Sequence, residues 1–188
     1  MNYWEERYLK NEIGWDIGAV STPLKEYIDQ LTNKACRILI PGVGNGYEFD
    51  YLSQKGFTNV FVVDIAASPL QKIAERNPGK DHQLIHGDFF ELTGTFDLIL
   101  EQTFFCAIFP TMREDYVEKI ENLLAPNGKI AGLLFDFPLT AEGPPFGGSV
   151  TEYEALFLKK FRIKTMEKAH NSIKPRQNKE LFFIFEKK

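Results

Sequence analysis

Short apolar runs alternate with longer amphipathic stretches along most of this chain. Apolar runs of about four to eight residues predict buried strands, whereas apolar positions three or four apart predict helices. Glycine, proline and asparagine mark many of the boundaries between the two kinds of segment. The predicted strands are residues 37–41, 59–64, 82–85, 95–101, 129–135, 161–168 and 180–187. This number of strands is enough for one substantial sheet.

Helices are predicted between most of these strands. They cover residues 22–31, 47–55, 68–76, 113–124 and 151–158, after a short amphipathic helix within 1–14. A break is expected at 125–128, where the sequence reads APNG. Strands and helices alternate through residue 135, which predicts a mostly parallel sheet with helices on both faces. No helix separates the last two strands, so we expect them to pair as antiparallel neighbours.

Length and composition indicate one soluble domain spanning 1–188. The chain has 188 residues, 44% of them hydrophobic and 26% charged, which suffices to bury about 70% of the unfolded surface. The net charge of −4 argues against nucleic-acid binding, which usually needs a basic patch. No apolar run approaches the ~20 residues of a membrane span, and the N-terminus is too polar for a signal peptide. We therefore expect a cytoplasmic monomer that binds neither membrane nor nucleic acid.

Cysteines and histidines give no sign of a metal site. Cys36 and Cys106 lie in apolar contexts without metal-ligand spacing, and the three histidines form no metal-binding motif. We interpret both cysteines as buried free thiols in a reducing compartment.

Residues 37–64 carry the strongest functional signal. A strand is followed by Gly42, Gly44 and Gly46, then by a helix and a second strand that ends in Asp64. Glycines let the backbone approach a ligand, and an acid about 20 residues later can bind two ribose hydroxyls. Tyr47 stands where a dinucleotide site needs its last glycine, so this pattern favours S-adenosylmethionine, which has no phosphate. A dinucleotide site or an ordinary strand–helix turn remains an alternative.

Other candidates follow from strand ends, where open parallel sheets bind ligands. Asp88 can accept from the exocyclic amine of an adenine while Phe89 packs on the ring, although a plain turn is the other reading. Asp136 is as well explained by a structural role. Trp4, Tyr8 and Trp15 can form a lid packed on the sheet, and aromatic faces also attract a sulfonium cation.

Several segments together resemble the thiopurine methyltransferase family of class I S-adenosylmethionine-dependent methyltransferases, close to its halide and thiol branch. These segments are WEERYLKNEIGWDIG, RILIPGVGNGYE, FDLILEQTFFCAIFP, GPPFG and KPRQNKE, and they extend over most of the chain. The resemblance implies a Rossmann-like fold with seven strands, mostly parallel, of which a final one is antiparallel. It also implies S-adenosyl-L-methionine as cofactor and an N-terminal lid, residues 1–20.

The resemblance further implies which residues contact the cofactor. They are Trp4, Tyr8, Trp15, Gly42, Gly44, Asp64, Asp88, Phe89 and Gln102. Two positions depart from the family pattern. Tyr8 stands where tryptophan is usual, and Gln102 replaces a tyrosine of the plant branch or an arginine of the thiopurine branch. The second change leaves the substrate open, because this position lies near the methionine end of the cofactor.

The expected acceptor is a small soft nucleophile such as a thiol, a thiopurine or a halide. A thiol is a few per cent ionised at neutral pH, so no residue is required as a general base. Candidates for the acceptor pocket are Tyr8, Phe104, Phe105, Ile108 and Phe146. Core packing explains Phe104 and Phe105 equally well, whereas Phe146 lies in a Gly/Pro loop that favours a lid role.

Two arginines could receive an anionic group of the substrate. Arg7 and Arg176 are the candidates, although a solvated surface charge is the commoner role for each.

Three other functions remain open. One is a methyltransferase with an oxygen or nitrogen acceptor. Another is a nicotinamide-dependent reductase, against which Tyr47 and the absence of a Tyr-x-x-x-Lys pair argue, since Ile120 follows Tyr116 at that spacing. The third is a binding module that keeps the cofactor site as a relic.

Overall fold

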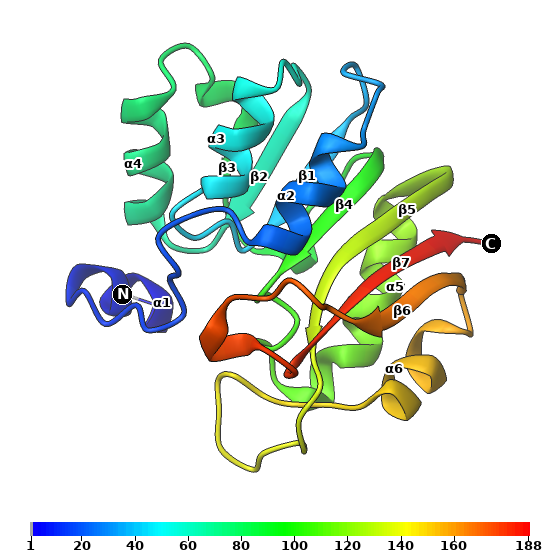
Figure 1. Ribbon diagram of the computed structural model, residues 1–188. Coiled ribbons are helices and arrows are strands. Elements are labelled where there is room, and N and C mark those ends of the chain that lie inside the picture. The colour runs from blue at the N-terminus through cyan, green and yellow to red at the C-terminus, as the bar shows by residue number, and fades with distance from the viewer. Residues whose placement is uncertain (1) are drawn as a thin grey trace.

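A twisted sheet of seven strands forms the centre of the protein, as the computed structural model shows for residues 2–188 (Figure 1). The strand order is β3-β2-β1-β4-β5-β7-β6. Neighbouring strands from β3 to β5 are parallel, and β7 runs antiparallel to both β5 and β6. The strands are β1 (Ile38–Pro41), β2 (Val60–Asp64), β3 (Leu84–His86), β4 (Phe96–Gln102), β5 (Leu124–Phe135), β6 (Phe161–Lys168) and β7 (Glu180–Lys187). This confirms the predicted fold class, including its final antiparallel strand.

Helices cover both faces of the sheet (Figure 1). They are α1 (Tyr3–Leu9), α2 (Thr22–Asp29), α3 (Tyr47–Gln54), α4 (Ala67–Arg76), α5 (Arg113–Leu123) and α6 (Val150–Phe157). Side chains of α2, α3 and α4 pack on one face, and those of α5 and α6 pack on the other. Successive residues of β1 alternate between the two cores, because side chains of a strand point to opposite faces. Ile38 and Ile40 belong to the first core and Leu39 to the second.

Two predicted boundaries are wrong in an informative way. The break expected at 125–128 lies inside β5, which begins directly after α5 at Leu124. The register with β4 changes from Phe96 opposite Leu124 to Leu98 opposite Lys129, so these residues form an irregularity within the strand rather than a loop. β3 begins at Leu84 because residues 81–83 form a short 3-10 helix.

The described residues contain neither a membrane-spanning helix nor a metal-binding group of side chains. Among residues 2–188, no helix has both the length and the apolar character needed to cross a membrane. In the same range, no group of three or more His, Cys, Asp or Glu side chains is placed to hold a metal ion. Cys106 is buried as expected, but Cys36 is only partly buried.

A buried carboxylate fixes the turn that follows β4. Glu101 is 1% exposed, and its Oε1 accepts from the backbone N–H groups of Phe104 and Phe105 at 2.8 and 2.9 Å. Its Oε2 accepts from the Tyr116 hydroxyl at 2.5 Å. These three bonds hold the start of the 103–109 segment against the sheet and α5. Burial nevertheless raises the pKa of Glu101 to about 7.

Gly132 of β5 gives a direct test of strand packing. A Cβ built on Gly132 would lie 2.2 Å from the backbone oxygen of Glu101, which requires the two strands to move apart. We expect Gly132→Ala to lower the free energy of unfolding by about 1–3 kcal/mol. Urea unfolding measures this. Gly14→Ala is the control, because nothing lies within 4 Å of a Cβ there; equal stability of the two variants would contradict the packing.

The raised pKa of Glu101 predicts a pH-dependent contribution to stability. The folded state favours the protonated acid, so the contribution is complete below the ordinary pKa of 4.5 and is lost as pH rises to about 7. Urea unfolding of the wild type and Glu101→Gln across this window measures it. The wild type should lose stability relative to the variant as pH rises. A stability difference that stays constant with pH would contradict the assignment.

Candidate functional site

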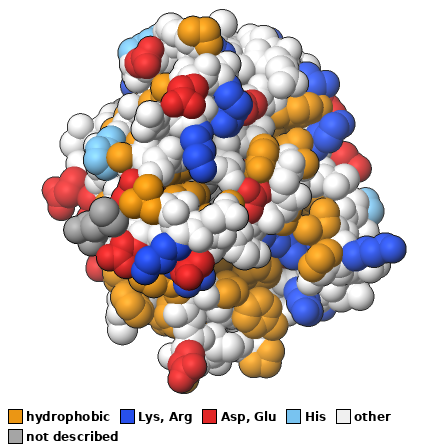
Figure 2. Space-filling view, turned by 90° about the vertical axis from the view of Figure 1, so that its left-hand side faces the viewer, with side chains coloured by type: hydrophobic (Ala, Val, Ile, Leu, Met, Phe, Trp, Pro, Cys, Tyr) orange, Lys and Arg blue, Asp and Glu red, His pale blue; other side chains and the backbone are white. Residues whose placement is uncertain are grey.

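A cavity of about 590 Å³ opens at the carboxyl ends of β1 to β4. It contains most of the residues predicted for the site, namely Trp4, Tyr8, Trp15, Gly42, Gly44, Asp64, Asp88, Phe89, Gln102, Phe104 and Ile108. Figure 2 views the molecule from the side of α1 and α4, where hydrophobic side chains gather on the lower part of the face beside charged ones. These residues come from five separate parts of the sequence and converge on one cavity.

The glycine turn after β1 forms the floor of this cavity. Gly42 and Gly46 have φ of 59° and 75°, a conformation that costs other residues energy. A Cβ on Gly42 would lie 2.3 Å from the Phe104 ring, and one on Gly46 would lie 2.6 Å from Ile73. Neither position can therefore carry a side chain. Because Gly42 has none, its backbone is exposed to a ligand in the cavity.

Asp64 ends β2 and links the glycine turn to the next loop. Its Oδ2 accepts from Gly44 N–H at 3.3 Å and its Oδ1 accepts from Ala66 N–H at 2.9 Å. The side chain is 8% exposed, and burial raises its pKa to about 6. It is thus mostly ionised at neutral pH and, with two bonds already fixing it, can accept further hydrogen bonds from a diol.

Asp88 and Phe89 combine the two roles that the sequence left open. Asp88 accepts from Phe90 N–H at 2.8 Å and so caps a 3-10 turn. It also lines the cavity, as does Phe89. The Phe89 ring packs on Phe104 and Tyr116 with centroid distances of 5.1 and 5.6 Å. Structural contacts therefore hold both side chains where they can meet a planar base.

Aromatic residues of the N-terminal segment form a cluster at the cavity. Trp15 meets Trp4 and Tyr8 edge to face, at centroid distances of 5.3 and 5.6 Å. The carboxylate of Glu5 accepts from the backbone N–H and hydroxyl of Ser68, which ties α1 to α4. These aromatics both pack together and line the cavity. A role in a lid is therefore compatible with contact to a sulfonium.

Two predicted pocket residues lie elsewhere. Phe105 is 1% exposed and packs against Tyr116 and Tyr153 in the core. Phe146 is 5% exposed, so it is buried although it lies in a Gly/Pro loop, where an aromatic side chain has less reason to be buried. Neither is among the residues that line the cavity, whereas Pro144 and Pro145 are. The loop folds inward because Phe146 N–H donates to the Cys106 carbonyl at 2.8 Å.

Arg176 is also not the solvated surface charge that its sequence context favours. It is 9% exposed and lines the cavity. Its Nη1 lies 3.3 Å from Glu180 Oε1, and its Nη2 donates to the Trp15 carbonyl at 2.7 Å. Arg7 lines the cavity too, but it is more exposed and pairs with Glu12. Asp136 pairs with Lys168, which supports a structural role.

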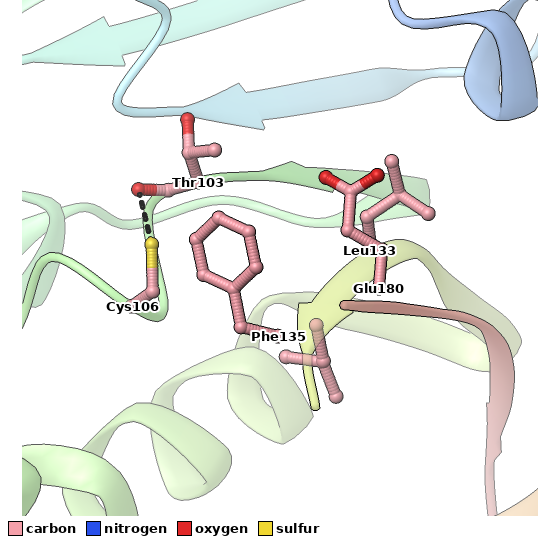
Figure 3. Close-up of a pocket in the computed structure, with 6 residues that line it drawn as sticks. Thr103, Cys106, Leu133, Phe135 and Glu180 are labelled. Carbon is pink, nitrogen blue, oxygen red and sulfur yellow. Dashed lines mark hydrogen bonds between the residues drawn. The ribbon is translucent and has the colours of Figure 1, made fainter. Parts of the chain in front are cut away.

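Sequence reasoning missed Glu48 and Cys106. Glu48 is a buried acid in the cavity wall, and its burial raises its pKa. Cys106 lies at the cavity and beside a small neighbouring pocket, where its thiol donates to the Thr103 carbonyl at 3.3 Å next to the Phe135 ring (Figure 3). Burial also raises the pKa of this thiol, which therefore stays protonated. Both lie in segments that carry the family resemblance, RILIPGVGNGYE and FDLILEQTFFCAIFP, but no spacing within those segments marks either one as a cavity residue.

The cavity suits S-adenosylmethionine better than a dinucleotide. A buried carboxylate at the end of β2 matches a ribose diol, and the aromatic cluster matches a sulfonium. Only two cationic side chains of the described chain line the cavity, Arg7 and Arg176, and each has an acidic partner. A pyrophosphate must approach the N-terminus of a helix closely. The helix α3 begins here with Tyr47, a large residue at the position where a dinucleotide site has its last glycine.

Comparison with known proteins also indicates a methyltransferase. The family model for thiopurine S-methyltransferase matches residues 1–188. Thiocyanate methyltransferase 1 of Brassica oleracea is 30% identical over 186 residues, covering 94% of this chain and 81% of that protein. Thiopurine S-methyltransferase of Nitrosospira multiformis is 27% identical over 186 residues, with 88% and 84% covered.

Solved structures share the fold. The 1,6-didemethyltoxoflavin-N1-methyltransferase of Burkholderia thailandensis, solved with bound 1,6-didemethyltoxoflavin and S-adenosylhomocysteine, has a TM-score of 0.80 at 20% identity, covering 98% of this chain and 85% of that one. A TehB-like methyltransferase of Corynebacterium glutamicum gives a TM-score of 0.73 at 17% identity, with 98% of both chains covered. The chain belongs to the thiopurine S-methyltransferase family and is an S-adenosylmethionine-dependent methyltransferase.

Proposed function

We propose that this enzyme transfers the sulfonium methyl group to a small thiol or a similarly soft nucleophile. The observation that carries the proposal is the character of the cavity wall beyond the glycine turn. That wall is apolar, with Phe104, Ile108, Phe109 and Met112, and no histidine or lysine of the described residues lines the cavity. Such a wall suits an acceptor that needs no proton removed by the protein. The names of the relatives, which act on thiocyanate and thiopurines, point the same way.

The reaction requires mainly orientation. The cofactor, when bound, supplies an activated methyl group. The residues of the chain then hold donor and acceptor in line and exclude water, a contribution worth up to ~7–11 kcal/mol in favourable cases. A thiol with a pKa near 8.5 supplies enough thiolate at neutral pH. The protonated Cys106 at the wall does not compete as an acceptor.

The cofactor contacts follow the order of strands along the sheet edge. Asp64 at β2 is proposed to bind the ribose hydroxyls, and Asp88 with Phe89 after β3 to hold the adenine. The backbone at Gly42 and Gly44 approaches the sulfur-bearing part. The remaining proposed contacts are Trp4, Tyr8, Trp15 and Gln102. The support is their convergence on a single cavity.

We further propose that 1–188 forms a single methyltransferase domain in which 1–20 is a lid over the cofactor site. The tie between Glu5 and Ser68 supports the lid, as do the bonds from Tyr47 and Asn45 to Asp16. A small-molecule acceptor, a monomeric state and a cytoplasmic location complete the proposal. Free cysteines fit a reducing compartment.

Matched acceptors test the reaction. Thiophenol and phenol have the same shape but differ in the reacting atom, and a phenol with a pKa near 10 stays protonated without a base. We expect thiophenol to be methylated at least about 10²-fold faster, the lower end of what general-base catalysis supplies. Release of S-adenosylhomocysteine at neutral pH measures both rates. Preferred turnover of phenol would contradict the soft-acceptor proposal, and cofactor binding without turnover of any thiol, halide or thiopurine would favour a relic.

Asp64→Ala tests the ribose contact. We expect this variant to bind S-adenosylhomocysteine at least about tenfold more weakly, because two hydrogen bonds to an ionised acceptor are lost. Calorimetric titration gives the affinity, and circular dichroism checks the fold. Asp115→Ala, an exposed acid on α5, is the matched control. Unchanged affinity in a folded Asp64→Ala variant would contradict the assignment.

A further inference from the structure

Thr103, directly after β4, holds a backbone conformation that its own side chain disfavours. Its φ is 59°, in the left-handed region that glycine adopts at no steric cost and where a β-branched residue is an outlier. Glu101 fixes the turn around it, because its carboxylate accepts from the backbone N–H groups of Phe104 and Phe105. Strained residues persist where their surroundings hold them, and they cluster at functional sites. The strain therefore indicates that a threonine side chain is useful here.

The hydroxyl of Thr103 is unpartnered, whereas polar groups beside it are engaged. Within residues 2–188, no hydrogen bond reaches this hydroxyl. The backbone carbonyl of Thr103 accepts from the Cys106 thiol at 3.3 Å. The side-chain oxygen of the preceding Gln102 accepts from the Ser21 hydroxyl at 3.2 Å. The Thr103 hydroxyl is therefore a donor that the protein leaves unused.

This hydroxyl faces open space rather than the packed interior. Thr103 is partly buried, and the unpartnered side-chain atoms of the described residues that are shut off from solvent belong to Tyr27, Ser53 and Arg113. Thr103 lines both the main cavity and the small pocket beside Cys106. In Figure 3 its hydroxyl points away from the Phe135 ring and the Cys106 thiol, which border the small pocket. This leaves the main cavity as the space that the hydroxyl faces.

Thr103 also begins the segment that forms the apolar wall of the cavity. That wall comprises Phe104, Ile108, Phe109 and Met112. On its other side, Thr103 follows Gln102, which is a proposed contact of the cofactor. A hydroxyl between these two groups is well placed to meet an acceptor that lies next to the cofactor. It can donate one hydrogen bond, and hydrogen bonds to ionised acceptors are among the stronger ones.

We propose that the Thr103 hydroxyl donates a hydrogen bond to the sulfur of a thiolate acceptor and holds it in line with the methyl group. This inference rests on the proposed function and adds a residue that binds the nucleophile itself. The acceptor loses its proton to water, and its lone pair forms the bond to the methyl carbon as the bond from that carbon to the cofactor sulfur breaks. The electron pair of the broken bond stays on that sulfur, which gives S-adenosylhomocysteine and a thioether. Thr103 keeps its own proton throughout.

Such a bond has two measurable consequences. The negative charge on the acceptor sulfur decreases as the new bond forms, so the hydrogen bond acts more on binding of the thiolate than on the transfer step. It also favours the ionised form of the bound acceptor and so lowers the pKa of the bound thiol. Thr103→Val keeps the branched shape without the donor, whereas Thr103→Ser keeps the donor. These two variants separate the hydroxyl from the shape of the side chain.

Steady-state kinetics with thiophenol and S-adenosylmethionine test the assignment. We expect Thr103→Val to raise the KM of thiophenol about tenfold and to lower kcat less. The rise of its kcat with pH should move upward by about one pH unit, because the bound thiol ionises less readily. Thr103→Ser should retain the KM and the pH profile of the wild type. Affinity for S-adenosylhomocysteine, from calorimetric titration, should be the same in all three proteins.

Thr58→Val is the matched control, because Thr58 is exposed and does not line the cavity. A folded Thr103→Val variant with the KM and pH profile of the wild type would overturn the proposal. Equal loss of acceptor and cofactor binding would also overturn it, since that result shows a structural role. Failure of the wild type to methylate any thiol would instead contradict the proposed function, so the two failures are distinguishable.

Thr103→Gly carries the test if Thr103→Val fails to fold. Glycine adopts the observed φ without steric cost, so this variant should unfold at a urea concentration no lower than the wild type does. It should nevertheless show the raised KM expected of Thr103→Val. Lower stability together with an unchanged KM would show that the threonine serves packing, and the proposal would then be wrong.

Discussion

The close contact between the glycine turn after β1 and the Phe104 ring is the constraint on which the site depends. Gly42 has a positive φ, and a side chain there would overlap that ring. The ring is held by the backbone bond from Phe104 to Glu101, which Tyr116 of α5 also contacts. The floor of the cavity is thus fixed from the α5 face of the sheet, so a change in that core reaches the site.

Three buried acids near the carboxyl edge of the sheet differ in how many hydrogen-bond donors the protein gives them. Glu101 has three donors and no access to the cavity, so its role is to anchor backbone. Asp64 has one donor on each oxygen and remains at the cavity wall, which suits a fixed acceptor for hydroxyls. Glu48 has a single long bond. The number of internal partners separates structural acids from those left for a ligand.

Regular periodicity made most of the fold predictable from sequence. Strands alternating with helices, followed by two strands with no helix between them, fix the parallel sheet and its antiparallel end. The predicted break at the APNG segment was wrong because its turn residues form an irregularity within β5. The turn residues alone cannot distinguish such an irregularity from a loop, since pairing with β4 determines which of the two forms.

The positions of cavity residues were predictable where a residue ends or closely follows a strand of the parallel sheet, as Asp64 and Asp88 do. Phe146 was misjudged because a backbone bond to Cys106 pulls its loop inward, a contact that depends on distant segments. Arg176 was misjudged for the same reason, since Trp15 lies 161 positions away along the chain. Buried charge in such places depends on tertiary contacts that composition does not reveal.

Calorimetric titration of the purified protein with S-adenosylhomocysteine is the most direct test of the central claim, that this cavity is a cofactor site for methyl transfer. The convergence of Asp64, the glycine turn and the N-terminal aromatics in one cavity predicts saturable binding in the micromolar range with one ligand per chain. Absence of binding at millimolar ligand would contradict the claim.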